Sequence, residues 1–225
     1  MQPEPSLCHL REVRRSFGRL RVLDGVDLTV HSGERILLLG ANGSGKSTLL
    51  RIAAGLIRPD GGQVVTTTLP AYLGHHLALY GDLTVRENLE LFARLAGAGE
   101  AAAEWLAAWH LTEHRDRRLR DLSRGLQLRT ALARTIGSAR TLLLLDEPTS
   151  ALDDEGVSEL CHQSDRRLVP NSGAAVVVTH DVSRLRAWAT RIVVLARGRM
   201  VIDSGVAAAA APLDAVIEAY RRENR

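Results

Sequence analysis

A glycine-rich loop constrains the possible folds of this chain more than any other feature. The loop reads Gly40-x-x-x-x-Gly45-Lys46-Ser47 and directly follows the short apolar run Ile36–Leu39. A run of this kind is typical of a strand buried on both faces of a parallel sheet. The residues after the loop, from about Leu49, predict a helix. Strand, loop and helix in this order are the setting that a phosphate-binding loop requires, so we predict an α/β domain that binds a nucleoside triphosphate.

The residue types in the loop fit this chemistry. Glycines allow backbone N–H groups to surround phosphates at the positive end of the following helix. Lys46 is predicted to bind the β- and γ-phosphates and to act in catalysis, and Ser47 to hold Mg²⁺. Lys46 is also the only lysine among 29 basic residues, as expected where a compact point charge is needed. The predicted nucleotide-binding residues of the loop are Gly40, Asn42, Gly43, Ser44, Gly45, Lys46, Ser47 and Thr48.

A second apolar run ends in two acidic residues. Leu142–Leu145 precedes Asp146 and Glu147. A buried strand here would aim Asp146 at Mg²⁺ and Glu147 at a water molecule beside the γ-phosphate. A carboxylate in that position can act as a general base or orient the water. We therefore predict Asp146 as a metal ligand and Glu147 as a catalytic residue.

Strand patterns flank a helical middle region. Thr84 and Glu87 have the spacing of a capping box before an apolar helix face, and another helix is predicted to begin at Ser123. The predicted strands are Leu7–Val13, Val22–Val30, Ile36–Leu39, Thr141–Leu145, Ala174–Thr179, Ile192–Ala196 and Met200–Asp203. The predicted parts are a core at about 1–75 and 138–206, a helical insert at about 76–137 and a short helix within 207–225.

Length and composition limit the classes of protein to which this chain can belong. A chain of 225 residues can form one domain with a sizeable core, and no apolar run approaches the roughly 20 residues that span a bilayer. Cys8 and Cys161 are too few for a disulfide framework or a metal site, and we expect Cys161, on the apolar side of a helix, to be a packed core thiol. A net charge of +3 is small for a nucleic-acid-binding protein, and we expect no nucleic-acid partner.

The segment Leu122-Ser123-Arg124-Gly125-Leu126, before Asp146, narrows the class further. With this segment, the chain resembles the ATP-binding-cassette (ABC) ATPases over essentially residues 7–205. The order of motifs is that of the family: phosphate loop, signature loop, acidic strand end and switch histidine. The resemblance implies a P-loop NTPase (RecA-like) core with an N-terminal antiparallel β subdomain and an inserted α-helical subdomain.

The resemblance also implies roles for individual residues. Phe17 would stack on adenine, unless it is only a core aromatic at a strand end. Ser123 and Gly125 would contact the γ-phosphate of a nucleotide bound by a second subunit. Asp153, in the segment after Ser150, would contact that subunit at the nucleotide site. His180 would contact the γ-phosphate and act in catalysis.

Two departures from the family pattern affect these expectations. Arg124 and Leu126 replace a usual glycine and glutamine in the signature loop, which leaves the details of nucleotide contact open. The family's Q-loop glutamine is also missing. We expect His76, in Tyr72-Leu73-Gly74-His75-His76, to stand in its place and meet a metal-bound water. The residues predicted to act at the metal are Ser47, Asp146 and His76.

The implied function is that of the ATP-hydrolysing subunit of an ABC transporter. Its cofactors would be ATP and Mg²⁺. Its partners would be a second nucleotide-binding subunit and polytopic membrane subunits, which would hold it at the cytoplasmic face of the cell membrane. The stretches Tyr72–His76, Asp82–Leu89 and Ser123–Gln127 resemble the haem-exporter ATPases of cytochrome c maturation. The alternatives are another exporter ATPase, for drugs, polysaccharides or peptides, and a soluble iron–sulfur assembly ATPase.

Overall fold

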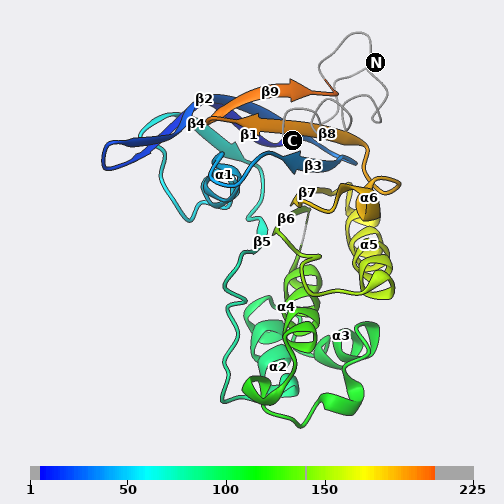
Figure 1. Cartoon of the computed structure of the whole chain (residues 1–225). Helices are drawn as coiled ribbons and strands as arrows, with labels where there is room; N and C mark the ends of the chain where they lie inside the picture. The colour runs from blue at the N-terminus through cyan, green and yellow to red at the C-terminus, as the bar shows by residue number, and fades with distance from the viewer. Residues whose placement is uncertain (1–5, 140, 206–225) are drawn as a thin grey trace.

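The computed structural model describes residues 6–139 and 141–205, which form two sheets and a set of helices (Figure 1). Three antiparallel strands form the first sheet in the order β2-β1-β4. The second sheet has the order β5-β6-β7-β3-β8-β9, and its pairs are parallel except for β8-β9. The strands are β1 (Ser6–Phe17), β2 (Leu20–His31), β3 (Arg35–Leu39), β4 (Gly61–Thr66), β5 (Ala71–Leu73), β6 (Leu142–Asp146), β7 (Ala174–Val178), β8 (Arg191–Ala196) and β9 (Arg199–Asp203).

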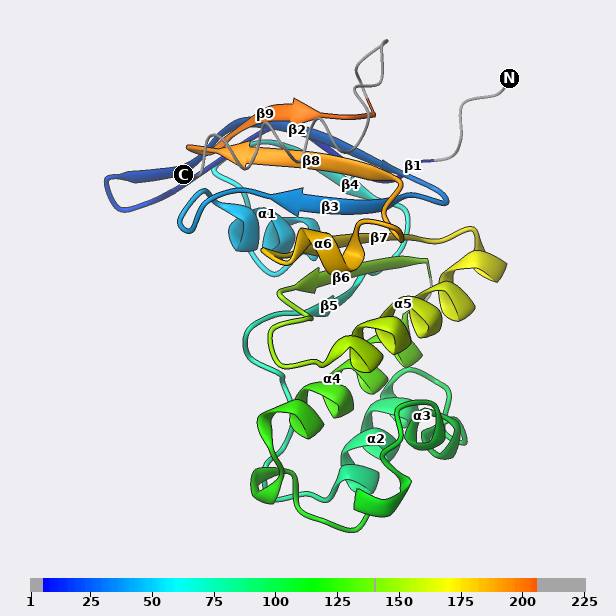
Figure 2. The same ribbon diagram turned by 45° about the vertical axis from the view of Figure 1, so that its right-hand side comes forward.

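The helices separate into two groups. Figures 1 and 2 show α2, α3 and α4 together on the side away from the three-stranded sheet, whereas α1 lies close to both sheets. We take α2, α3 and α4 as the helical subdomain, and its boundaries at 76 and 137 stay a prediction. The helices are α1 (Lys46–Ala53), α2 (Val85–Leu95), α3 (Ala102–Ala108), α4 (Arg124–Ser138), α5 (Asp154–Leu168) and α6 (Val182–Leu185). None of the helices within residues 6–139 and 141–205 has the length and apolarity that a bilayer crossing requires.

The central strand β3 is buried on both faces. Leu37 and Leu39 belong to the apolar core that includes side chains of α2, α3, α4 and α5. Ile36 and Leu38 belong to a second core, which includes side chains of α1 and of the three-stranded sheet. Alternate side chains of a strand point to opposite faces, so a continuous apolar run fits a strand between two cores. The phosphate-binding loop therefore starts at the end of a strand that is enclosed between two apolar cores.

The entrance to the helical region is fixed by a capping box and a buried amide. The Thr84 hydroxyl accepts a hydrogen bond from Glu87 N–H at 3.2 Å, and the Glu87 carboxylate accepts one from Thr84 N–H at 2.8 Å. The predicted capping box is confirmed. Asn88, one turn into α2, is fully buried and bonds to both backbone groups of Tyr80, at 2.8 and 2.9 Å. These bonds hold the segment that leads from β5 to α2.

Several element boundaries differ from those predicted. Strand β1 continues to Phe17 and β2 begins at Leu20, so the connecting turn is shorter than expected. Helix α1 begins at Lys46 and not at Leu49, because the left-handed Gly45 already forms its N-cap. The sequence patterns predicted neither β4, which opens on two glycines, nor β5, which has only 3 residues. The helix predicted within 207–225 lies outside the described residues.

Both cysteines pack against apolar cores and should react slowly. Cys8 is buried in β1 and Cys161 is partly buried on α5, and burial raises the pKa of each thiol to about 11. Only the thiolate attacks alkylating agents. We expect iodoacetamide at pH 8 to modify both thiols far more slowly in the native protein than in urea, as followed by mass spectrometry. Equal native and denatured rates for either cysteine would contradict this expectation.

Candidate nucleotide-binding site

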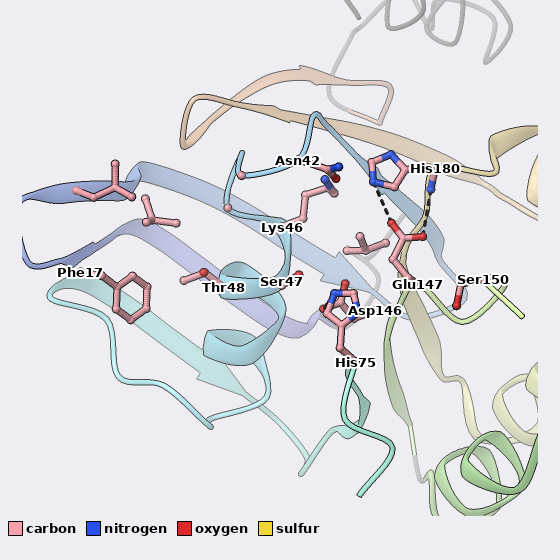
Figure 3. A pocket seen from close by; sticks show the side chains of 15 residues that line it. Phe17, Asn42, Lys46, Ser47, Thr48, His75, Asp146, Glu147, Ser150 and His180 are labelled. Carbon is pink, nitrogen blue, oxygen red and sulfur yellow. Dashed lines mark hydrogen bonds and ion pairs between the residues drawn. The ribbon is translucent and has the colours of Figure 1, made fainter. Parts of the chain in front are cut away.

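The parallel strands deliver polar residues to one edge of the larger sheet. The phosphate-binding loop follows β3, His75 follows β5, Asp146 and Glu147 stand at the end of β6, and His180 follows β7. These residues surround a cavity of about 600 Å³ (Figure 3). Ligands of open α/β sheets bind at the carboxyl ends of the strands. The cavity is therefore in the position expected of a ligand site.

Two glycines of the loop cannot be replaced without displacing backbone. Gly45 has a φ of 107°, and an added Cβ would lie 2.8 Å from the backbone oxygen of Val22. At Gly40, an added Cβ would lie 2.2 Å from the backbone oxygen of Leu195. The loop thus sits directly against β2 and β8, which fixes its backbone around the N-terminus of α1. This explains the glycine spacing in terms of packing.

Lys46 is held inside the loop and has almost no solvent exposure. Its exposed fraction is 6%, and Nζ donates hydrogen bonds to the backbone oxygens of Gly40 at 2.6 Å and Ala41 at 2.9 Å. Burial lowers the pKa of Lys46, and the nearby carboxylates of Glu147 and Asp146 offset part of that effect. A phosphate entering the cavity would meet this ammonium group at the mouth of the loop.

Asp146 provides a direct test of whether the site fits a divalent cation. Its side chain is 0% exposed, and neither carboxylate oxygen has a hydrogen-bond partner. A buried carboxylate without partners is costly unless a cation compensates it. The Ser47 hydroxyl lines the same cavity, and oxygen donors of these two kinds are those that Mg²⁺ prefers. The residues present therefore fit a Mg²⁺ ion bound together with a nucleotide.

Glu147 and His180 form a pair at the far side of the cavity from Phe17 (Figure 3). Glu147 Oε1 lies 3.2 Å from His180 Nε2, and Glu147 Oε2 accepts a hydrogen bond from His180 N–H at 3.4 Å. Glu147 has a φ of 54°, a conformation that non-glycine residues adopt rarely and often at functional sites. Burial raises the pKa of Glu147, and His180 offsets part of that effect. A raised pKa makes this carboxylate a better-matched general base near neutral pH.

Phe17 forms an exposed aromatic surface at the end of β1. It lines the cavity beside Leu20 and Val22, and 47% of the residue is exposed, so it is not a core aromatic. The guanidinium of Arg15 lies over the ring at 4.8 Å and forms an ion pair with Asp60 at 2.5 Å. A cation over an aromatic face is favourable, so this pair steadies the ring beside the cavity.

The structure brings most of the predicted site residues together. Those that line the cavity are Phe17, Asn42, Gly43, Gly45, Lys46, Ser47, Thr48, Asp146, Glu147 and His180. Gly40 and Ser44 belong to the loop but face a neighbouring cavity on the β8 side. Ser123, Gly125, Asp153 and His76 do not line the nucleotide cavity. Leu20, Val22, Ser150 and Val178 line it without having been predicted to bind nucleotide.

Of the two neighbouring histidines after β5, His75 lines the cavity and the predicted His76 does not. His75 Nε2 lies 3.8 Å from Asp146 Oδ2, whereas His76 is exposed away from the cavity lining. The reason lies in the preceding backbone: β5 ends at Leu73, and Gly74 packs so closely on the Tyr72 ring that an added Cβ would lie 2.5 Å from the phenol oxygen. His75, the first residue after Gly74, reaches the cavity. The double histidine in the sequence carried no signal of which residue that would be.

The N-terminus of α4, which follows the predicted signature loop, is capped and exposed to solvent. Ser123 is the N-cap of α4, and its hydroxyl accepts a hydrogen bond from Leu126 N–H at 3.4 Å. Ser123 is exposed, so the positive end of a 15-residue helix is open to a ligand. Asp153 caps α5 by accepting a hydrogen bond from Gly156 N–H at 2.9 Å, and pairs with Arg129 at 3.0 Å.

The loop after β3, the acidic pair at the end of β6 and the histidine after β7 define a P-loop NTPase. The model of the ABC transporter family matches residues 23–150, more than half of the chain. The chain belongs to the ABC transporter family, and it is an ATP-binding cassette whose hydrolysis of ATP is coupled to transport.

Similar proteins and structures support the family and the fold. The aliphatic sulfonates import ATP-binding protein SsuB 1 of Nocardia farcinica (strain IFM 10152) is 36% identical over 92% of this chain and 85% of its own. The cytochrome c biogenesis ATP-binding export protein CcmA of Gluconobacter oxydans (strain 621H) is 42% identical over 77% of this chain and 81% of its own. A dimeric bacterial ABC transporter cassette is 26% identical, with a TM-score of 0.80, 87% of this chain covered and 97% of that chain.

Proposed function

We propose that two nucleotide-binding subunits of this kind close head to tail over two ATP molecules. The observation that carries this proposal is the separation of two sets of residues within one chain. The cavity holds Lys46, Asp146 and Glu147, whereas the open helix end at Ser123 lines no part of it. A second subunit must therefore supply the helix end. A solved cassette at 26% identity is dimeric, which supports this arrangement.

The chain's own residues have distinct tasks in this proposal. The loop N–H groups and Lys46 bind the phosphates, and Phe17 supports the adenine ring. Asp146 and Ser47 would hold Mg²⁺, which supplies positive charge to the phosphates when bound. Glu147 accepts the proton of the attacking water, and the partner's helix end stabilises charge on the γ-phosphate.

His180 has a more limited task in the same mechanism. Its ring contacts the Glu147 carboxylate, so it can orient that base while it contacts the γ-phosphate. Closing the two subunits would exclude water from these groups and strengthen their interactions with the nucleotide. Hydrolysis would remove the γ-phosphate contacts and reopen the dimer, which is the motion passed to the membrane subunits.

A mixing experiment tests the head-to-tail arrangement. Lys46→Ala removes the lysine from both sites of a homodimer, and Ser123→Arg blocks both helix ends. Neither variant should hydrolyse ATP efficiently by itself. A mixed dimer would combine both defects in one site and leave the other site intact, so a mixture should regain hydrolysis. No recovery in mixtures shown to contain heterodimers would contradict the arrangement, as would full activity of Ser123→Arg alone.

We further propose that the transporter exports haem for cytochrome c biogenesis, with this subunit at the cytoplasmic face of the membrane. The support is the 42% identity to the cytochrome c biogenesis export protein, against 36% for the sulfonate import protein. The second candidate is an importer ATPase, because the sulfonate import protein aligns with 92% of this chain, against 77%.

Gene deletion separates these two candidates. Loss of the chain in its own organism should remove haem-stained c-type cytochromes and leave growth on a sulfonate as the sole sulfur source unchanged. Wild-type chain should restore the cytochromes, and the Glu147→Gln variant should not. The opposite pattern, with normal cytochromes and lost growth on sulfonate, would overturn the haem proposal and favour import.

A further inference from the structure

The buried carboxylate at the end of β6 faces a ring nitrogen as well as oxygen donors. The Asp146 side chain is fully buried and neither of its carboxylate oxygens has a hydrogen-bond partner, and Oδ2 lies 3.8 Å from His75 Nε2. Figure 3 shows the His75 ring beside Asp146 and on the same side of the cavity as Ser47. The cavity wall therefore offers nitrogen and oxygen donors at one place.

We propose that His75 supplies an imidazole nitrogen to the divalent cation that binds with the nucleotide. This ATPase would then bind borderline first-row ions such as Co²⁺ better, relative to Mg²⁺, than a site with oxygen donors alone. The inference rests on the nucleotide-binding function proposed above and concerns which ion that function uses.

The distance between the two side chains is short enough for one shared ion. Ligand atoms of small divalent ions lie about 2.1 Å from the metal, so two ligands of one ion are at most about 4.2 Å apart. The 3.8 Å between His75 Nε2 and Asp146 Oδ2 falls within this limit. It is also longer than a hydrogen bond, so the carboxylate is not already satisfied by the ring.

The backbone on either side of His75 holds the ring near this position. On the N-terminal side, Gly74 is packed against Tyr72. At His75 itself, the backbone oxygen accepts a hydrogen bond from the Arg124 guanidinium at 3.4 Å. The His75 side chain remains 61% exposed, so it can still adjust to an incoming ion. The signature loop thus contacts the backbone of the residue that faces the metal position.

The types of donor atom determine which metal ions the site binds more tightly. Imidazole nitrogen suits cobalt, nickel, copper and zinc, whereas Mg²⁺ prefers oxygen donors and retains its waters. No group of three or more His, Cys, Asp and Glu residues within 6–139 and 141–205 is placed to hold a metal ion. In this proposal the nucleotide phosphates complete the coordination, so the ion should bind more tightly when nucleotide is present.

Pulsed electron paramagnetic resonance of Mn²⁺ with ADP tests the nitrogen contact without any need for turnover. The wild-type protein with Mn²⁺ and ADP should show the nitrogen modulation of a coordinated imidazole. His75→Gln should abolish this modulation, and His76→Gln, its neighbouring histidine, should retain it. Absence of nitrogen modulation in the wild type, or its loss only in His76→Gln, would overturn the proposal.

Calorimetric titration of Co²⁺ and Mg²⁺ in the presence of ADP gives the second readout. His75→Gln should weaken Co²⁺ binding by about tenfold and change Mg²⁺ binding much less. Equal losses for both ions would indicate a structural effect of His75 and overturn the proposal. Failure of the wild type to bind ADP with Mg²⁺ would instead contradict the nucleotide-binding function itself. The two failures are therefore distinguishable.

Discussion

Replacing Glu147 with glutamine should lower the steady-state rate of ATP hydrolysis by about two to four orders of magnitude. The amide keeps the shape of the side chain but cannot accept the proton of the attacking water. The nucleotide-binding groups are unchanged, so ATP should still bind and close the subunits. Phosphate release measures the loss of hydrolysis, and size-exclusion chromatography with ATP should show a stable dimer.

Two controls separate this catalytic effect from misfolding. Glu113→Gln changes an exposed glutamate away from the cavity and should leave hydrolysis unchanged. Burial raises the pKa of Glu147, so its contribution to stability is present below the unfolded pKa and is lost as pH rises through the folded pKa. Glu147→Gln should therefore be at least as stable as wild type at neutral pH. A monomeric variant with ATP, or one with normal turnover, would contradict the assigned role.

Local sequence patterns predicted the central part of the site because its residues immediately follow buried strands. Ile36–Leu39 and Leu142–Leu145 are apolar throughout, so their ends are visible in the sequence, and Lys46, Asp146 and Glu147 follow at short fixed intervals. The chain direction of parallel strands then places these residues at one edge of the sheet. No long-range information was needed for this step.

The histidine that lines the cavity near Asp146 shows where local patterns fail. Strand β5 has only 3 residues, and its position is set by pairing with β6, where Tyr72 lies opposite Leu144. Such a short strand has too little apolar periodicity to define its register, and a shift of one residue exchanges the faces. The choice between His75 and His76 therefore depends on contacts between segments that are distant in the sequence.

The role of Arg191 could not be predicted from the sequence either, although its guanidinium bonds to residues of three separate segments. Its guanidinium bonds to both carboxylate oxygens of Asp203, at 2.5 and 2.7 Å, to Glu34 at 2.9 Å, and to the backbone oxygen of Thr29 at 2.9 Å. Only 6% of Arg191 is exposed. Burial by itself would lower the pKa of Arg191, but the two carboxylates raise it above its ordinary value. In an arginine-rich sequence, no local feature distinguishes this buried arginine from the exposed ones.

Arg191→Met should lower the free energy of unfolding by about 3–5 kcal/mol, because it leaves the carboxylates of Glu34 and Asp203 without their cation. This is a large fraction of the roughly 5–15 kcal/mol that stabilises a typical domain. Urea unfolding, followed by circular dichroism, measures the change. Arg199→Met is the matched control, since Arg199 also pairs with an aspartate, Asp24, but its side chain is 69% exposed. It should cost no more than about 1 kcal/mol.

A triple variant separates the lost charge from the lost packing. Combining Arg191→Met with Glu34→Gln and Asp203→Asn removes the uncompensated carboxylates and keeps the side-chain volumes similar. This variant should recover part of the stability that Arg191→Met loses, because the unpaired buried charges are the main cost. If the triple variant is less stable than Arg191→Met alone, the guanidinium acts mainly through packing and its bond to Thr29. Since Arg191 begins β8, next to the strand that leads into the phosphate-binding loop, its loss should also lower the temperature at which nucleotide binding fails.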